Sequence, residues 1–192
     1  MSPTRNRAAT SYARPSAGEL AAARGKRLRD VIGSELKVLF CGINPGLYSA
    51  ATGNHFARPG NRFWPALYAA GFTPRRFQPS EKDAFLRLGY GLTNLVPRAT
   101  ASADELEPAE FIAGRAGLAR KVRRYRPRMV AFLGMGAYRY AFGQPKATLG
   151  EQDQRFQAAR VWVLPSPSGL NASYQMGALV AELRKLQHAL RA

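Results

Sequence analysis

The chain has 192 residues and a mass of 21.0 kDa, a size that suits one domain with a core on both faces of a sheet and does not favour two domains. It carries 29 Lys and Arg against 12 Asp and Glu, a formal net charge of +17. This excess favours a polyanionic partner, with nucleic acid first, because each cation near a phosphate releases condensed counterions. A hydrophobic content of 46% excludes a disordered basic protein, and one cysteine with two histidines makes a disulfide framework or a histidine-rich metal site unexpected.

Residues 1–27 are predicted to form a flexible basic tail, and residues 28–192 a single folded domain. The tail has many arginines and one acidic residue, Glu19. It is interpreted either as an arm that raises nonspecific affinity for DNA or as a mitochondrial transit peptide, since both are rich in Arg and poor in acids. No apolar run approaches the length that spans a bilayer, so no membrane partner is expected.

Four short apolar runs are predicted to be strands: residues 38–43, 92–96, 129–133 and 161–164. Continuous apolar runs of this length are typical of parallel strands that are buried on both faces. The amphipathic segments between them suit helical crossovers. The expected fold class is therefore α/β, a three-layer α/β/α sandwich with a short, mainly parallel central sheet.

Three of the intervening segments are predicted to be helices. A capping box at residues 80–83 indicates the start of the first, and the third covers residues 173–190. In the second, apolar residues recur on one face, at Phe111, Leu118, Val122 and Tyr125. Its opposite face is strongly basic and is read either as a solvated surface or as a surface that faces phosphates.

Two loops follow the ends of predicted strands, where ligands bind in open parallel sheets. The first strand runs into residues 42–46, where Pro and Gly form a tight turn around Asn44. The fourth runs into residues 164–170, a Pro-rich loop that ends in Leu170 with no obvious core to enter. Each loop alone is common, but both at one sheet edge of a strongly basic chain indicate a specific nucleic-acid site.

Four motifs in chain order resemble the mismatch-specific uracil/thymine-DNA glycosylase family, which is family 2 of the uracil-DNA glycosylase superfamily. The first is Gly-Ile-Asn-Pro-Gly-Leu at residues 42–47, and the second is Phe56 followed by Asn-Arg-Phe-Trp at residues 61–64. The third is Gly-Leu-Thr-Asn-Leu-Val at residues 91–96, and the fourth is Leu-Pro-Ser-Pro-Ser-Gly-Leu at residues 164–170. The resemblance covers residues 28–190 and leaves the tail outside.

The resemblance implies a uracil-DNA glycosylase-like fold and a role in DNA base excision repair. The enzyme would flip uracil, and related lesions such as ethenocytosine, out of a G·U mismatch in double-stranded DNA. It would then hydrolyse the N-glycosidic bond and leave an abasic site. The resemblance further implies a bacterial, cytoplasmic, nucleoid-associated monomer that needs no cofactor and no metal.

The resemblance also implies roles for individual residues. Asn44 would be catalytic and would position the attacking water. A second catalytic residue, Asn94, is expected from its place at the end of the second predicted strand, where it would share the pocket and help hold the water or the sugar; the alternative for Asn94 is a strand-end amide that fixes a neighbouring loop. The base would be bound by Ile43, Tyr48, Phe56 and Ser166. The duplex would be contacted by Ser168, Gly169, Leu170 and Asn171, with Leu170 as a wedge.

General chemistry agrees with these roles. A base inside a duplex must be extruded before it can react, and the cost is least where the pair is already mismatched. An apolar wedge such as Leu170 replaces the lost stacking. Amide donors can stabilise the charge that develops on the departing uracil. The amide of Asn44 is not basic and can only orient the water.

Other readings concern single residues and competing function classes. His55 is expected to be a solvated or locally hydrogen-bonded loop residue, and Cys41 a small buried hydrophobe. The Gly-Met-Gly turn at residues 134–136 is similar to a dinucleotide-binding turn, but Arg139 stands where the last glycine belongs. The second competing class is a non-catalytic basic nucleic-acid-binding module.

Overall fold

The structure is a computed structural model that describes residues 14–169 and 174–191. Its centre is a five-stranded sheet with the order β2-β1-β3-β5-β4. Four strands are parallel, namely β1 (Val38–Gly42), β2 (Tyr90–Asn94), β3 (Met129–Leu133) and β5 (Ala159–Leu164). The predicted fold class and all four predicted strands are confirmed, with ends that differ by one or two residues.

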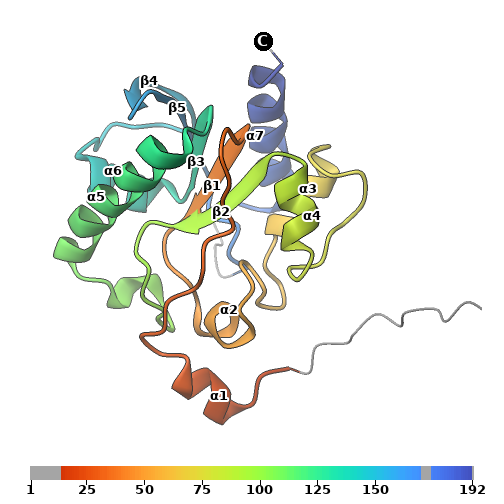
Figure 1. Cartoon of the computed structure of the whole chain (residues 1–192), viewed down its shortest axis with the longest axis vertical. Helices are drawn as coiled ribbons and strands as arrows, with labels where there is room; N and C mark the ends of the chain where they lie inside the picture. Colours follow the sequence, from red (N-terminus) through yellow and green to blue (C-terminus); the bar gives the residue numbers. More distant parts are fainter. Residues whose placement is uncertain (1–13, 170–173, 192) are drawn as a thin grey trace, which may run out of the picture.

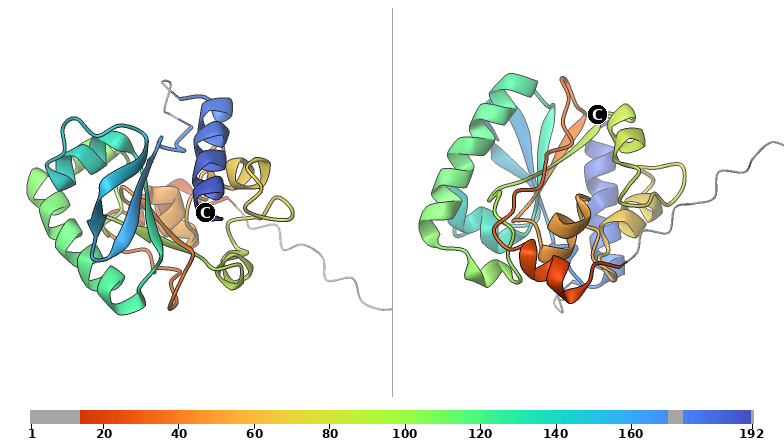
Figure 2. Two further views of the ribbon diagram at one scale, coloured as in Figure 1. Left: turned by 90° about the horizontal axis from the view of Figure 1, so that it is seen from above. Right: turned by 60° about the horizontal axis from the view of Figure 1, so that its bottom comes forward.

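Helices cover both faces of the sheet (Figures 1 and 2). One face packs against α3 (Phe63–Ala69), α4 (Lys82–Arg87) and α7 (Met176–Ala189), and the other against α5 (Pro108–Tyr125) and α6 (Met135–Phe142). Successive residues of a strand point to opposite faces, so in β1 Phe40 enters the first core while Leu39 and Cys41 enter the second. This places the four parallel strands, which are almost completely buried, between two helical layers.

Cys41 is a buried hydrophobe, as predicted. Its side chain is 1% exposed, and this burial raises the pKa of the thiol. Among the described helices, none is both long enough and apolar enough to cross a membrane.

A fifth strand, β4 (Gly150–Phe156), was not predicted. It lies at the edge of the sheet and runs antiparallel to β5. Most of its side chains are exposed, so the segment has no apolar run to mark it. The turn into β5 places Gln157 and Ala158 in the left-handed region, at φ 51° and 71°. Hairpin turns of this kind are usually marked by Asn or Gly.

The prediction of a flexible tail over residues 1–27 is wrong for its second half, while residues 1–13 lie outside the described residues. Helix α1 (Ala17–Ala22) begins at a capping box in which Ser16 and Glu19 bond each other's backbone N–H groups. Ala23 is fully buried, and the Gly25 N–H donates to Ala99 O at 2.9 Å. Residues 14–27 therefore belong to the folded domain.

The segment after α1 covers the outer edge of the sheet. Val31 and Leu92 of β2 exchange backbone hydrogen bonds of 2.9 and 2.7 Å in an antiparallel bridge. A free strand edge is a template for pairing with another chain. This bridge and the neighbouring contacts protect part of the β2 edge.

Two predicted helix starts differ from the structure. Helix α4 has Glu81 as its N-cap residue, without a side-chain cap. The Glu81 carboxylate instead accepts from the Arg75 guanidinium at 2.6 Å and from the Gln78 N–H at 2.8 Å, so the predicted capping box at residues 80–83 is wrong. The last helix begins at Met176 rather than at residue 173. The basic helix is confirmed as α5.

Candidate active site

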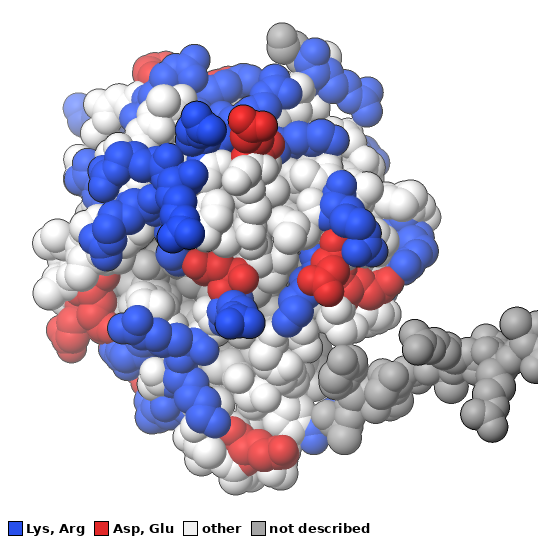
Figure 3. Space-filling model, viewed as in Figure 1, with Lys and Arg blue, Asp and Glu red and all other residues white. Residues whose placement is uncertain are grey.

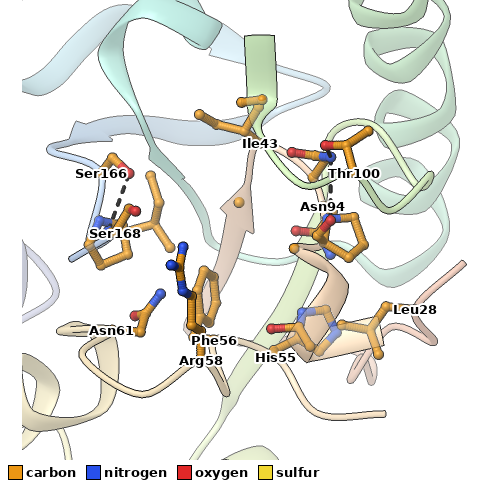
Figure 4. A pocket seen from close by; sticks show the side chains of 18 of the residues that line it. Leu28, Ile43, His55, Phe56, Arg58, Asn61, Asn94, Thr100, Ser166 and Ser168 are labelled. Atoms are coloured by element: carbon orange, nitrogen blue, oxygen red, sulfur yellow. Dashed lines mark hydrogen bonds between the residues drawn. The ribbon is translucent and has the colours of Figure 1, made fainter. Parts of the chain in front are cut away.

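A pocket of about 320 Å³ lies beyond the carboxyl ends of the parallel strands. Figure 4 shows Ser166 and Ser168 on one side of it and Asn94 with Thr100 on the other, with Phe56 between them. These residues come from loops and strand ends that lie far apart in the sequence. The two short elements beside the pocket are α2 (Leu47–Thr52) and the 3-10 helix η1 (Ala103–Glu105).

Asn44 lines the pocket with a side chain whose orientation is fixed. Its Nδ2 group donates to Thr100 Oγ1 at 2.6 Å and to Arg98 O at 3.1 Å. Thr100 Oγ1 in turn donates to Ser102 O at 2.7 Å. Because a carbonyl oxygen can only accept, the nitrogen of Asn44 must face Arg98. Within the described part of the chain no hydrogen bond reaches Asn44 Oδ1, so this oxygen remains an acceptor for a water molecule.

Asn94, the last residue of β2, lies in the same pocket and is 7% exposed. It pairs in register with Gly42 of β1. A Cβ atom on Gly42 would lie 2.7 Å from Asn94 Oδ1 and 3.3 Å from Phe56 Cζ. The glycine therefore lets the carboxamide and the ring approach the end of β1. No hydrogen bond from the Asn94 side chain is seen among residues 14–169 and 174–191, which does not support the alternative role of fixing a neighbouring loop.

Phe56 presents its ring to the pocket from a strained backbone. Its φ is 54°, a left-handed conformation that costs a residue with a side chain about 1–2 kcal/mol. The ring stacks on Phe63 with centroids 4.1 Å apart and an interplanar angle of 29°, and Phe63 itself is buried in the core. The stacking fixes the ring and provides an aromatic surface at the pocket wall.

His55 precedes Phe56 and is buried rather than solvated, at 2% exposure. Its Nε2 lies 3.0 Å from Arg29 O, and its own carbonyl accepts from Trp64 Nε1 at 3.1 Å. Burial lowers the pKa of His55 to about 4, so near neutral pH a neutral ring donates from Nε2 to the carbonyl. The expectation of a solvated or locally hydrogen-bonded histidine is therefore wrong in part, because the ring is hydrogen-bonded to a residue 26 positions away and lines the pocket. The histidine anchors the N-terminal segment beside the pocket.

The loop after β5 forms the opposite wall. Ser166 and Ser168 line the pocket, and the Ser168 N–H donates to Ser166 Oγ at 3.4 Å. A Cβ atom on Gly169 would lie 2.7 Å from Gly60 O, which shows how closely the two backbones approach. Leu170 and Asn171, predicted as DNA contacts, lie outside the described residues.

Arg62 holds this loop from the side of the second motif. Its backbone N–H donates to Pro167 O at 2.9 Å. Its guanidinium donates to Tyr174 O at 2.5 Å and also to Ser168 O. One side chain therefore binds the chain on both sides of residues 170–173. Arg62 belongs to the second motif, but nothing in the sequence marks it for this contact.

Of the remaining predicted residues, Ile43 lines the pocket and Tyr48 does not. Tyr48 lies in α2, where successive side chains are turned by about 100°. The next residue, Ser49, is the one directed inward: it is buried, lines the pocket, and accepts from the Ala57 N–H at 3.2 Å. The prediction that Tyr48 lines the pocket is therefore wrong.

A basic groove of about 1190 Å³ adjoins the pocket and shares Leu28 and Asn94 with it. It runs between residues 25–32 and α5. Its exposed arginines are Arg27, Arg29, Arg120 and Arg124. The basic face of α5 that the sequence predicted thus continues from the pocket along the side of the molecule.

The geometry around α6 does not favour a dinucleotide site. Gly134 is the N-cap residue of α6, and a Cβ atom there would lie 3.0 Å from Ile43 Cδ1. The isoleucine side chain thus packs where a phosphate would approach the glycine turn. Among the described residues, no group of three or more His, Cys, Asp or Glu side chains could hold a metal ion.

Two comparisons with known proteins bear on the family and the fold of this chain. The family model described as the Uracil DNA glycosylase superfamily matches residues 29–191. The chain is also similar to a solution NMR structure of a "putative Uracil DNA glycosylase from Methanosarcina acetivorans", with a TM-score of 0.55 and 20% sequence identity. That match covers 85% of this chain and 99% of the other, and at this identity it bears on the fold alone.

Proposed function

The chain belongs to the uracil DNA glycosylase superfamily, and we propose that it removes uracil from G·U mismatches in double-stranded DNA by hydrolysing the N-glycosidic bond. The observation that carries this proposal is an oriented amide, Asn44, in a pocket walled by a stacked aromatic ring. Related lesions such as ethenocytosine belong to the proposed substrate range. We further propose that the protein acts as a monomer in the bacterial cytoplasm.

The substrate base reaches the pocket by leaving the duplex. Extrusion costs a few kcal/mol and least at a mismatch, which favours a G·U pair over a matched pair. The neighbouring groove supplies cations for the phosphates on one side of the pocket. Counterion release at such contacts supplies affinity that does not depend on sequence.

The flipped base would stack on Phe56. Phe56 and Asn94 both lie against Gly42, so a base on the ring would bring its edge to the Asn94 carboxamide. That carboxamide offers one donor and one acceptor group, which complements the alternating acceptor and donor groups of a uracil edge. Ile43 and Ser166 would complete the enclosure. Asn94 would thereby bind the base rather than the water.

Asn44 would orient the attacking water through Oδ1, because its Nδ2 is already bound to Thr100 and Arg98. An amide does not take up the proton as a carboxylate would. The reaction therefore depends on stabilising the departing uracil anion, to which backbone N–H groups near Ile43 and Phe56 would contribute. Good leaving groups such as uracil are consequently favoured over cytosine.

The loop after β5 would enter the duplex, with Leu170 in the gap left by the base and Gly169 near the widowed guanine. Arg62 would hold this loop in position by donating hydrogen bonds to Ser168 O and Tyr174 O. A loop that is fixed on both sides loses less conformational entropy when it enters the duplex.

The test is single-turnover excision by the wild type and by Asn44→Ala on G·U, A·U and G·T duplexes and on single-stranded uracil DNA. We expect the wild type to cleave G·U fastest and Asn44→Ala to be slower by about 100-fold or more, because a mispositioned nucleophile costs about that much. Binding to a uracil-free duplex should be unchanged in the variant. Equal loss of binding and excision would contradict the assignment of Asn44.

A non-catalytic basic nucleic-acid-binding module remains the second candidate, favoured by the net charge of +17. The same assay separates the two functions. Binding by the wild type without any abasic product on the whole substrate panel would establish the second candidate.

A further inference from the structure

A second basic surface lies on the edge of the sheet opposite the pocket. Here the amino ends of the parallel strands meet the carboxyl ends of α5 and α7. Figure 3 shows lysine and arginine side chains gathered along the top of the molecule in this view, above the ends of these helices. Strands of five or six residues separate this edge from the pocket by about 17–20 Å.

Two adjoining cavities hollow this edge, and we call them together the rear basic surface. One, of about 380 Å³, is lined by Arg126, Arg128, Arg155 and Arg160. The other, of about 300 Å³, is lined by Lys37, Arg128 and Arg191. The cavities share Arg128 and Leu190, and neither has an acidic residue in its lining.

Three of these cations make contacts within the fold. Arg160 forms a bidentate pair with Glu151 at 2.7 and 2.8 Å and donates to Ala189 O. Arg155 donates to Ala158 O at 3.2 Å, and Lys37 lies over the ring of Tyr90. The side chains of Arg126 and Arg128 are exposed and form no hydrogen bond or ion pair with any described residue. Gathering free cations at one edge is unfavourable by mutual repulsion, which a bound polyanion would relieve.

The shape of the surface favours an extended polyanion over a compact one. Because the two cavities share Arg128, their cations continue from one cavity into the other, and their linings contain one aromatic residue, Tyr90, which is 8% exposed. A free nucleotide would need an accessible ring or free polar groups for its base. The two glutamines of the linings are already engaged, Gln157 with Arg123 and Gln187 with Gly71 O. A sugar-phosphate backbone needs only spaced cations.

We propose that the rear basic surface binds the phosphate backbone of a second DNA segment while the pocket edge holds the first. The identity of the polyanion rests on the proposed function, because a protein that acts on DNA meets DNA as its main polyanion. Two opposed basic edges let one molecule bridge neighbouring duplexes and pass between them without release into solvent. The surface thus serves the search for lesions rather than their excision.

The test is capture of a fluorescent uracil-free duplex by a second uracil-free duplex fixed to beads, with the full-length protein as the bridge. The rear variant is Arg126→Gln with Arg128→Gln and Arg155→Gln. The matched control is Arg76→Gln with Lys146→Gln and Arg184→Gln, which removes the same charge at exposed positions outside both rear cavities. Single-turnover excision of a G·U duplex at saturating enzyme is measured for all three proteins.

We expect the wild type and the control to capture the second duplex, and the rear variant to capture at least about five-fold less. The dependence of capture on salt should become shallower in the rear variant by about 0.9 for each phosphate that the protein no longer neutralises. Excision should stay within about two-fold in all three. Equal capture by the control and the rear variant, no capture by the wild type, or capture of RNA in place of DNA would overturn the proposal. If the wild type excises uracil but does not capture the second duplex, the role of the rear basic surface is refuted and the proposed function is not. If it captures the second duplex but does not excise uracil, the proposed function is refuted and the role of the surface is not.

Discussion

Gly42→Ala is expected to damage the pocket through a single methyl group. The new Cβ atom would lie 2.7 Å from Asn94 Oδ1 and 3.3 Å from Phe56 Cζ, whereas ordinary contact begins at 3.4 Å. The carboxamide must therefore retreat by about 0.7 Å, while the ring gives way only slightly. Asn94 is 7% exposed, Phe56 is stacked on Phe63, and both side chains line the pocket, so a displacement of either one changes the shape of the pocket.

The size of the effect follows from this geometry. Inserting a methyl group into a packed site costs about 1–3 kcal/mol of stability. A displacement approaching 1 Å among groups that position a substrate costs up to about 100-fold in rate. We therefore expect Gly42→Ala to fold with a lower melting temperature and to excise uracil about 10- to 100-fold more slowly in single turnover.

Gly46→Ala is the matched control. Gly46 also lines the pocket, but a Cβ atom there has nothing within 4 Å. Its φ of −72° suits alanine, and the loss at this N-cap position is confined to stability. Gly46→Ala should keep its excision rate within about two-fold. Similar excision rates for the two variants would refute the packing of Asn94 and Phe56 around Gly42 as a requirement of the site.

Three further predictions concern other parts of the chain. Asn94→Asp should excise uracil at least about 10-fold more slowly on G·U duplexes, because a carboxylate cannot donate to the base edge and repels its oxygen; faster excision would place residue 94 at the water instead. His55→Gln should lose a pH dependence of stability measured by urea unfolding from pH 8 to 4. Burial lowers the pKa of His55 to about 4, so below about pH 6.5 the unfolded chain binds a proton that the folded chain does not. Between about pH 6.5 and 4 the free energy of unfolding of the wild type should therefore fall by up to about 3 kcal/mol more than that of the variant. The same dependence on pH in both proteins would contradict this. Removing residues 1–13 should leave melting unchanged and lower the salt slope of binding to uracil-free DNA by about 0.9 for each phosphate that these residues neutralise; an unchanged slope would mean that they do not touch DNA.

The parallel strands were predictable because their chemistry is uniform. Residues 38–42 and 129–133 are almost entirely apolar, and both faces of these strands are buried. Strand β4 was not predictable in this way, because it is a polar edge strand whose pairing depends on β5. Helix α1 has a local signal, the Ser16 and Glu19 capping box, but the helix is short and the segment around it is rich in arginine, a composition that is also typical of a flexible tail.

The residues of the candidate site also differ in how far the sequence predicts them. Asn44, Phe56 and Asn94 stand in motifs at strand ends, so the sequence placed them at one edge. Thr100, which orients Asn44, carries no such mark, because its role depends on a loop after β2 meeting a loop after β1. Tyr48 was misplaced because the helical rotation of α2, rather than distance along the chain, decides which side chain faces the pocket.

The bridge between Val31 and Leu92 has a practical consequence for dividing this chain. The family model begins at residue 29, so a shortened protein started there would keep Val31 but lose Ala23 and the Gly25 to Ala99 hydrogen bond, which tie the segment to the domain. The loosened segment would expose the outer hydrogen-bonding edge of β2, and intermolecular strand pairing would follow. N-terminal truncations meant to improve solubility should therefore remove no residue beyond 13.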